Sequence, residues 1–113
     1  MSKVTIYHNP RCTKSRQTLK LLEEHGVEPA VIEYLKTPPD AATIKQLLKN
    51  LGISAQDLIR RKEHRALGLD DTDDEAELIK RMAAHPEIIE RPIVVKGRAA
   101  RLGRPPEAVL EIL

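Results

Sequence analysis

The chain contains a single cysteine, Cys12, and its position favours nucleophilic chemistry. Cys12 follows a short β-branched and aromatic run, residues 4–7, and precedes a segment with helical spacing, so we expect it at the start of a helix. Unpaired N–H groups at a helix N-terminus stabilise a negative charge, and so do nearby cations such as Arg11, Lys14 and Arg16. The pattern therefore indicates a reactive thiolate, although a lone cysteine can also be an inert buried side chain.

Two polar side chains near Cys12 in the sequence could tune this thiolate. Ser15 stands one helical turn later, where its hydroxyl can donate to a thiolate or accept from backbone N–H groups. His8 ends the predicted strand at the same loop and could act as a nearby cation or a proton carrier. The simpler interpretations are a first-turn helix serine and a histidine that faces solvent or braces the loop. The sequence leaves both pairs of interpretations open.

Three arginines occur where they could converge on an oxyanion. Arg60 ends a short helical stretch, Arg91 directly precedes a predicted strand, and Arg104 lies between the last strand and the last helix. Guanidinium groups make paired, charge-assisted hydrogen bonds to tetrahedral anions such as arsenate and phosphate. Each arginine alone could equally be a solvated surface residue, and residues 60–65 resemble a solvated charge run. Convergence near Cys12 is what distinguishes an anion site from these simpler interpretations.

The elements that must position these residues follow from the hydrophobic periodicity. Strands are predicted at residues 4–7, 28–35, 92–95 and 99–102. Helices are predicted at residues 13–25 and 40–51, in two shorter stretches that open at Ser54 with Asp57 and at Thr72 with Glu75, and after Pro105. Asp40 should cap its helix and Gly52 should end it. The first two strands should be parallel because a helix connects them, and the last two should form a hairpin.

This order of elements predicts an α/β protein with a thioredoxin-like fold, a four-stranded mixed sheet and a helical insertion between strands two and three. The whole chain, residues 1–113, is expected to form a single domain with a helical subdomain at about 40–85. Pro92 opens the third strand where thioredoxin-like proteins carry a cis-proline, although frequency alone favours a trans bond.

Composition and charge exclude several classes of function. The 19 Lys and Arg against 17 Asp and Glu are too balanced for a nucleic-acid-binding protein. Since no apolar run approaches the ~20 residues that span a bilayer and no signal peptide is visible, we expect a cytoplasmic protein without a membrane partner. No metal site is expected, because the acidic run at residues 70–75 lacks the EF-hand pattern and suits a helix N-terminus. A single cysteine also requires an external thiol for any redox cycle.

Several short motifs along the chain form a specific pattern when taken together. They are the segment 6–12 (IYHNPRC) with Ser15-Arg16, Tyr34-Leu35, Thr37-Pro38-Pro39, Gly52-Ile53-Ser54, the segment 91–95 (RPIVV) and the segment 101–105 (RLGRP). This pattern resembles the glutaredoxin-coupled arsenate reductase family, and the resemblance covers essentially the whole chain. It implies that Cys12 is the nucleophile, that Arg60, Arg91 and Arg104 form the anion site, and that His8 and Ser15 tune the thiolate.

The same resemblance implies a reaction, its substrates and its partners. In that family the thiolate attacks arsenate, glutathione displaces water to give a mixed arsenic–thiol adduct, and glutaredoxin completes the reduction to arsenite. The chain would thus be an oxidoreductase of arsenic resistance, with arsenate or a related oxyanion as substrate, glutathione as co-substrate, glutaredoxin as partner and no bound cofactor.

Two alternative functions remain compatible with the sequence. One is a non-enzymatic thioredoxin-like transcription regulator that binds RNA polymerase, and the other is a general glutathione-linked thiol oxidoreductase of unknown substrate. The three arginines favour the enzyme, because a regulator has no need of convergent guanidinium groups for a tetrahedral anion.

Overall fold

The structure, a computed structural model, describes residues 3–113, and these divide into two compact units. The first, called the sheet unit below, comprises the residues up to Thr37 together with Arg91–Leu113. The second, called the helical unit, comprises Pro38–Glu90 and includes the predicted helical subdomain at about 40–85. That the two units together make a single domain stays a prediction.

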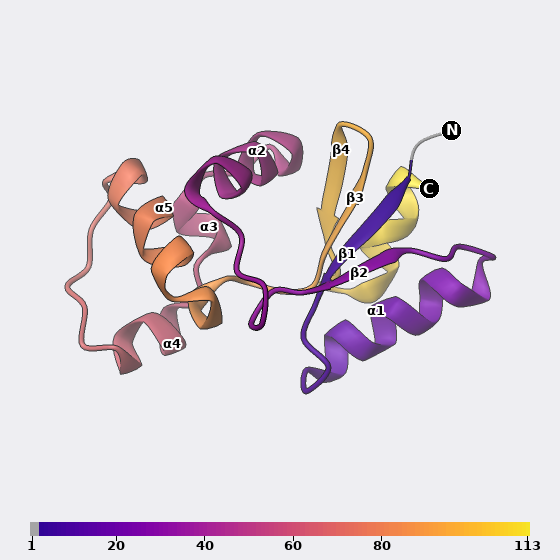
Figure 1. Cartoon of the computed structure of the whole chain (residues 1–113), viewed down its shortest axis with the longest axis horizontal. Coiled ribbons are helices and arrows are strands. Elements are labelled where there is room, and N and C mark those ends of the chain that lie inside the picture. Colours follow the sequence, from indigo (N-terminus) through magenta and orange to yellow (C-terminus); the bar gives the residue numbers. More distant parts are fainter. Residues whose placement is uncertain (1–2) are drawn as a thin grey trace. The chain divides into compact units, whose positions relative to one another are not determined.

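The sheet unit contains a four-stranded mixed sheet, as predicted (Figure 1). Its elements are β1 (Val4–His8), α1 (Thr13–Glu24), β2 (Ala30–Glu33), β3 (Ile93–Lys96), β4 (Ala99–Leu102) and the 3₁₀-helix η2 (Pro106–Ile112). The strand order is β2-β1-β3-β4. Strands β1 and β2 are parallel, whereas β3 is antiparallel to both β1 and β4. The connection from β1 through α1 to β2 is therefore the predicted βαβ crossover.

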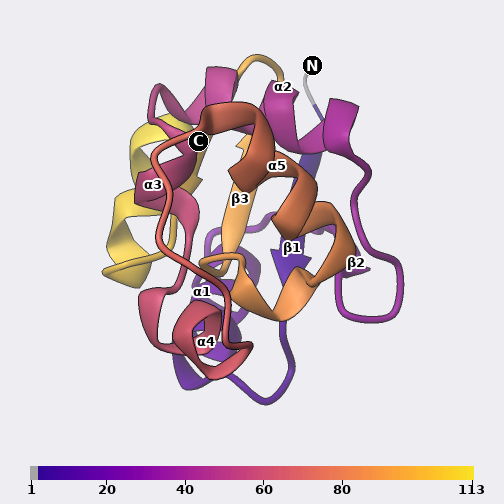
Figure 2. The ribbon, with the colours of Figure 1, turned by 90° about the vertical axis from the view of Figure 1, so that its left-hand side faces the viewer.

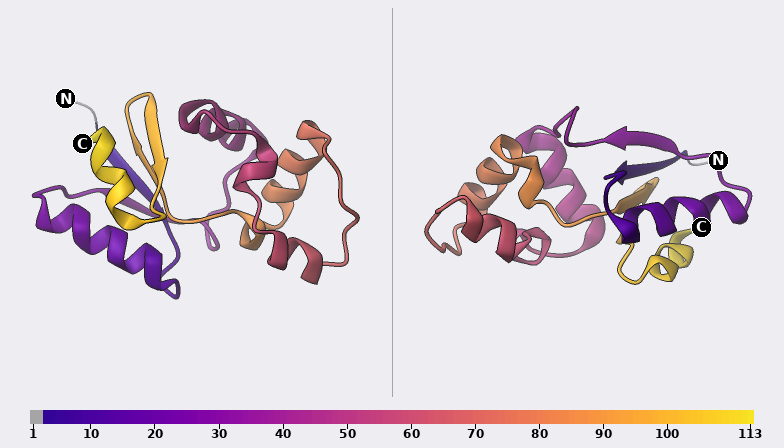
Figure 3. Two further views of the ribbon diagram at one scale, coloured as in Figure 1. Left: turned by 180° about the vertical axis from the view of Figure 1, so that it is seen from behind. Right: turned by 90° about the horizontal axis from the view of Figure 1, so that it is seen from below.

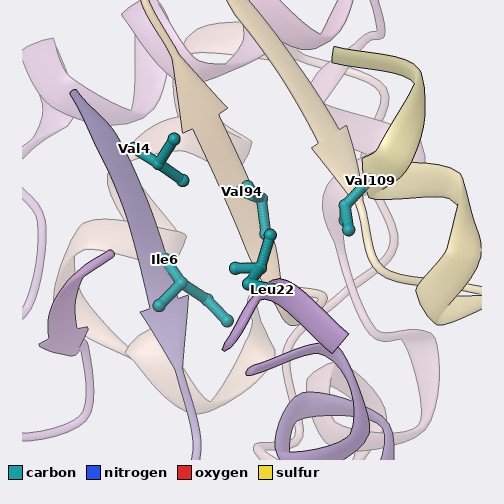
Figure 4. Close-up of a cluster of buried hydrophobic side chains, with 5 residues drawn as sticks. All are labelled: Val4, Ile6, Leu22, Val94 and Val109. Carbon is teal, nitrogen blue, oxygen red and sulfur yellow. The ribbon is translucent and has the colours of Figure 1, made fainter. Parts of the chain in front are cut away.

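One face of this sheet is buried against α1 and η2 (Figure 3). Alternate residues of β1 point to it, since successive side chains in a strand face opposite sides. Val4 and Ile6 pack there with Leu22 of α1, Val94 of β3 and Val109 of η2 (Figure 4). The next β1 residue in this alternation is His8, which is buried on the same face. The end of β1 therefore brings a histidine to the side of the sheet that α1 covers.

The helical unit is built around contacts of α2 and α3 with α5. Its elements are α2 (Ala41–Leu51), α3 (Ala55–Leu58), α4 (Arg61–Ala66), α5 (Glu75–Ala84) and the 3₁₀-helix η1 (Pro86–Ile88). Asp40 caps α2 as predicted, because its carboxylate accepts the Thr43 N–H at 2.8 Å. Gly52 ends α2 in the left-handed conformation with φ of 71°.

The helical unit differs from the sequence prediction in three places. Most of residues 60–65, interpreted as a solvated charge run, belongs to an additional helix, α4 (Arg61–Ala66), which buries His64. Helix α5 begins later than the predicted start at Thr72, because the Asp74 carboxylate accepts the Glu77 N–H and is the actual cap. Before α3, the Ser54 hydroxyl donates to the Asp57 carboxylate and makes no cap bond to a backbone N–H.

Two elements of the sheet unit also differ from the prediction. Strand β2 covers only Ala30–Glu33 of the predicted 28–35, since Pro29 has no N–H to donate and a turn begins at Glu33. The predicted C-terminal helix is a 3₁₀-helix over Pro106–Ile112. No helix in residues 3–113 has both the length and the apolar character needed to cross a membrane.

Gly103 generates a first prediction, because the chain passes very close to its neighbours there. A Cβ atom at Gly103 would collide with Thr18 Oγ1 and would lie 2.6 Å from Pro92 Cγ. We expect Gly103→Ala to lower the free energy of unfolding by about 1–3 kcal/mol, as overpacking does. Urea denaturation measures this change.

The double variant Gly103→Ala/Thr18→Ala provides the control for this prediction. Thr18→Ala removes both Thr18 atoms that the new Cβ would meet, so the combined loss of stability should be smaller than the sum of the two single losses. Strict additivity, or a Gly103→Ala variant as stable as the parent protein, would contradict the predicted collision.

Candidate active site

Cys12 occupies the N-cap position of α1, in extended backbone conformation. Two bonds from Asn9 shape the loop before it: the Asn9 side-chain oxygen accepts the Arg11 N–H, and the Asn9 carbonyl accepts the Cys12 N–H, both at 3.0 Å. The Cys12 side chain is mostly buried, with 8% of its surface exposed. The thiol is thus held at the positive end of a twelve-residue helix, as the sequence predicted.

His8 and Ser15 bond to each other beneath this loop. The His8 Nδ1 and Ser15 Oγ atoms are 2.6 Å apart, and the Asn9 N–H donates to the same Ser15 oxygen at 3.0 Å. Both side chains are buried. Within residues 3–113 no hydrogen bond joins Ser15 to Cys12. The effect of His8 and Ser15 on the Cys12 thiolate stays a prediction. Any effect of Ser15 acts through the loop and His8.

The environment of His8 disfavours its charged form. Burial lowers the pKa of His8 below its usual value, Arg16 lowers it further, and the carboxylate of Glu33 opposes them. The neutral ring suits the loop-bracing interpretation better than that of a nearby cation. The neutral, buried His8 ring stabilises the folded protein fully above its unfolded pKa of about 6.5. This stabilisation is lost as the pH falls through the lower pKa that His8 has in the folded protein.

One of the three predicted arginines, Arg104, lies beside Cys12 in the sheet unit and is held by the Arg91 backbone. The Arg104 Nη2 atom lies 3.7 Å from the Cys12 sulfur, and its Nε–H donates to the Arg91 carbonyl at 2.7 Å. Arg91 precedes Pro92, and the peptide bond between them is cis, whereas frequency alone favoured trans. The Pro92 carbonyl in turn accepts the Gly103 N–H at 2.9 Å. The start of β3 and the end of β4 thus bring the Arg91 backbone against the Arg104 side chain, and convergence of their two guanidinium groups near Cys12 stays a prediction.

The third predicted arginine, Arg60, belongs to the helical unit and is bonded within it. Its guanidinium forms ion pairs with Glu63 and with Glu90, each at 3.0 Å. The hydrogen bond from Arg60 lowers the pKa of Glu63. Convergence of Arg60 with Arg91 and Arg104 near Cys12 stays a prediction.

Sequence reasoning missed the residues that hold the loop. Arg16 was considered only as a nearby charge, but its guanidinium donates to the Pro10 carbonyl and to the Thr13 hydroxyl, both at 3.3 Å. The segment His8-Asn9-Pro10 predicts a loop after the first strand, but the role of Asn9 in holding that loop was missed, although asparagine can bond its own backbone two residues on. Among the described residues, no group of three or more His, Cys, Asp or Glu side chains could hold a metal ion.

This arrangement is suited to attack on an anion. A guanidinium 3.7 Å from the Cys12 sulfur, at the N-terminus of a helix, favours the approach of a negatively charged group to that sulfur. The same features would stabilise oxygen atoms that carry charge in a transition state.

The ArsC family model matches residues 7–112 of this chain. "Uncharacterized protein YfgD" of Escherichia coli K12 is 57% identical over 114 residues, which cover 97% of this chain and 96% of that protein. An arsenate reductase of Haemophilus influenzae is 46% identical, over 97% of this chain and 98% of that protein. A solved arsenate reductase structure from Vibrio cholerae shares 47% identity with a TM-score of 0.86, over 99% of this chain and 98% of that chain. These similarities confirm the resemblance and the predicted fold.

The surroundings of His8 generate a second prediction. Arg16→Ala should raise the pKa of His8, because it removes a repelling cation, and Glu33→Gln should lower it, because it removes an attracting carboxylate. The pH titration of the His8 ring signals by NMR measures both shifts. Lys20→Ala, which removes an exposed cation one turn further along α1, is the control and should shift the midpoint less than Arg16→Ala. Shifts of the same sign in the Arg16 and Glu33 variants would contradict the assigned causes.

Proposed function

We propose, from the premise that the chain belongs to the ArsC family, that it is an arsenate reductase with Cys12 as its nucleophile. The observation that carries the proposal is the 3.7 Å approach of the Arg104 guanidinium to the Cys12 sulfur at the N-terminus of α1. A cation and free helix N–H groups at a thiol favour the thiolate and attract an anionic substrate. An inert buried cysteine requires neither.

The first chemical step forms a bond between the Cys12 sulfur and arsenic. The thiolate attacks the arsenic(V) centre of arsenate, and one oxygen leaves as water after protonation. N–H groups at the start of α1 and the guanidinium groups of Arg91 and Arg104 stabilise the remaining oxygens. Arg60 is proposed as a third guanidinium group. His8 and Ser15 hold the loop in which the nucleophile stands, and the neutral His8 ring leaves the thiolate charge to the other groups.

Reduction needs two electrons, which one cysteine cannot supply as a disulfide within the chain. We assign them to two external thiols, glutathione as co-substrate and glutaredoxin as protein partner, with no bound cofactor. Overall, arsenate and two thiols give arsenite, one disulfide and one water, so atoms and electrons balance. A reducing compartment such as the cytoplasm suits this external-thiol scheme.

Arsenate turnover gives the direct test of this function and is our third prediction. The protein should reduce arsenate to arsenite when both glutathione and glutaredoxin are present, and Cys12→Ser should abolish the reaction because a hydroxyl is a far weaker nucleophile. Arsenite formation is measured directly. Reduction of glutathione mixed disulfides without arsenate turnover would favour a general thiol oxidoreductase. Absence of both activities, together with measurable binding to RNA polymerase, would favour a transcription regulator.

The paired hydrogen bonds of an arginine give a fourth prediction. Arg91→Lys keeps the charge but loses the planar fork, so kcat/KM for arsenate should fall about tenfold or more. Arg98→Lys is the matched control, because Arg98 is an exposed arginine in the β3–β4 turn, at the opposite end of β3 from Arg91. This control should keep parent activity. Equal activity in the two variants would remove Arg91 from the anion site.

A further inference from the structure

The helical unit contains a pocket of its own, of about 400 Å³. Its lining residues come from α3, α4, α5 and the connection between α4 and α5, residues 67–74. Figure 2 shows how these elements are arranged. Pockets of about 300–1,000 Å³ are the usual size for small-molecule sites. Ile59 and Leu78 give the pocket an apolar part, and the remaining lining is polar or charged. Cys12 belongs to the sheet unit, and none of the site residues Cys12, His8, Ser15, Arg60, Arg91 and Arg104 lines this pocket.

Helix α4 supplies one wall of the pocket through Arg61, His64 and Arg65. Residues at this spacing lie on one face of a helix. His64 is 5% exposed, and its Nε2 atom lies 3.1 Å from the Arg81 guanidinium. A guanidinium only donates, so Nε2 must accept and the ring proton is on Nδ1. Within residues 3–113 no hydrogen bond engages His64 Nδ1, so its N–H is available to a ligand.

Arg81 also fixes the connection that forms the facing wall. Its Nη1 donates to the Asp70 carbonyl at 2.7 Å, and its Nε pairs with Glu77 at 3.1 Å. The same guanidinium therefore holds both the His64 ring and the start of the acidic segment that follows Asp70.

The facing wall carries the opposite charge, through Asp71 and Asp73. Neither is needed for capping α5, because Asp74 is the cap and Glu75 and Glu77 already place negative charge in the first turn. Across residues 3–113, no ion pair or side-chain hydrogen bond engages Asp71, Asp73, Arg61 or Arg65. The two arginines and the two carboxylates that line the pocket are thus not ion-paired within the described residues.

We propose that this pocket binds the α-amino-acid end of a small zwitterion. The ligand carboxylate would accept from the Arg61 and Arg65 guanidinium groups and from His64 Nδ1–H, and its ammonium group would donate to Asp71 and Asp73. A simple anion would be repelled by the two carboxylates, and a polyamine would be repelled by the two arginines. Both the γ-glutamyl end of glutathione and a free amino acid carry this chemistry. The zwitterion assignment follows from the charge pattern of the pocket alone. The choice of glutathione as the ligand also rests on the proposed function.

Titration of the full-length protein with S-methylglutathione tests this proposal. The blocked thiol cannot exchange with Cys12, so binding is measured separately from arsenate reduction, by ¹H–¹⁵N NMR. The expected result is saturable shifts at pocket residues, including the His64 ring. N-acetylation of the ligand, which removes the ammonium group, should weaken binding about tenfold, since each charge-assisted bond is worth about that factor.

Variants on one helix then separate the pocket from its surroundings. Arg65→Ala should weaken binding about tenfold, whereas Lys62→Ala, an exposed cation on α4 outside the pocket lining, should leave it unchanged. Asp71→Asn/Asp73→Asn should erase the preference for the free ammonium group. Both sites are exposed, so these variants should fold normally.

The ligand series identifies the source and can overturn the proposal. Glutamate that binds as tightly as S-methylglutathione assigns the pocket to free amino acids, and weaker glutamate binding assigns it to the tripeptide. Inorganic phosphate that shifts the same residues with equal affinity would overturn the zwitterion assignment. So would equal affinity of Arg65→Ala and Lys62→Ala, no binding of either ligand, or shifts confined to residues 9–16. None of these binding outcomes would change the expected arsenate turnover, so failure of the pocket proposal can be distinguished from failure of the proposed function.

Discussion

The Ser15 hydroxyl joins the end of β1 to the first turn of α1, and the position of Cys12 depends on that junction. Its oxygen meets His8 Nδ1 at 2.6 Å and the Asn9 N–H at 3.0 Å, in a region that solvent does not reach. A buried polar group without a partner costs about 1–3 kcal/mol, so other arrangements of strand end, loop and helix are disfavoured. The loop at residues 9–12 is therefore held both by this junction and by the hydrogen bonds of Arg16 to Pro10 and Thr13.

A second constraint, at the other end of the chain, brings the cation to the thiol. Gly103 has no Cβ, and only this absence lets the end of β4 approach Thr18 of α1 and the Pro92 ring. The Gly103 N–H bond to the Pro92 carbonyl fixes the approach, and the next residue, Arg104, then reaches both the Arg91 carbonyl and the Cys12 sulfur. The reactive thiol is thus positioned by α1, while the cation is positioned by a backbone contact against that same helix.

The parts of the fold that sequence could predict are those with strong local signals. Asp40 and Gly52 mark the ends of α2 because capping and left-handed conformation depend on a few adjacent residues. Helix α4 escaped prediction because only His64 of its six residues is buried, so the segment has no hydrophobic period. The pairing of His8 with Ser15 depends on which face of β1 the histidine occupies, and the ion pair of Arg60 with Glu90 spans thirty positions. Neither contact leaves a local pattern.

The arginines of the proposed anion site differ in the groups to which they are bonded. Arg60 pairs with the carboxylates of Glu63 and Glu90, and these pairs are only partly exposed to water. In the proposed site, an oxyanion would share Arg60 with these two carboxylates. Arg60 would then attract the oxyanion through directed hydrogen bonds more than through net charge. The Arg104 Nε donates to the Arg91 carbonyl, which orients the guanidinium beside the Cys12 sulfur. In the proposed anion site, Arg104 would therefore act from a position already fixed at the nucleophile, whereas Arg60 would act mainly through directed hydrogen bonds once the anion is bound.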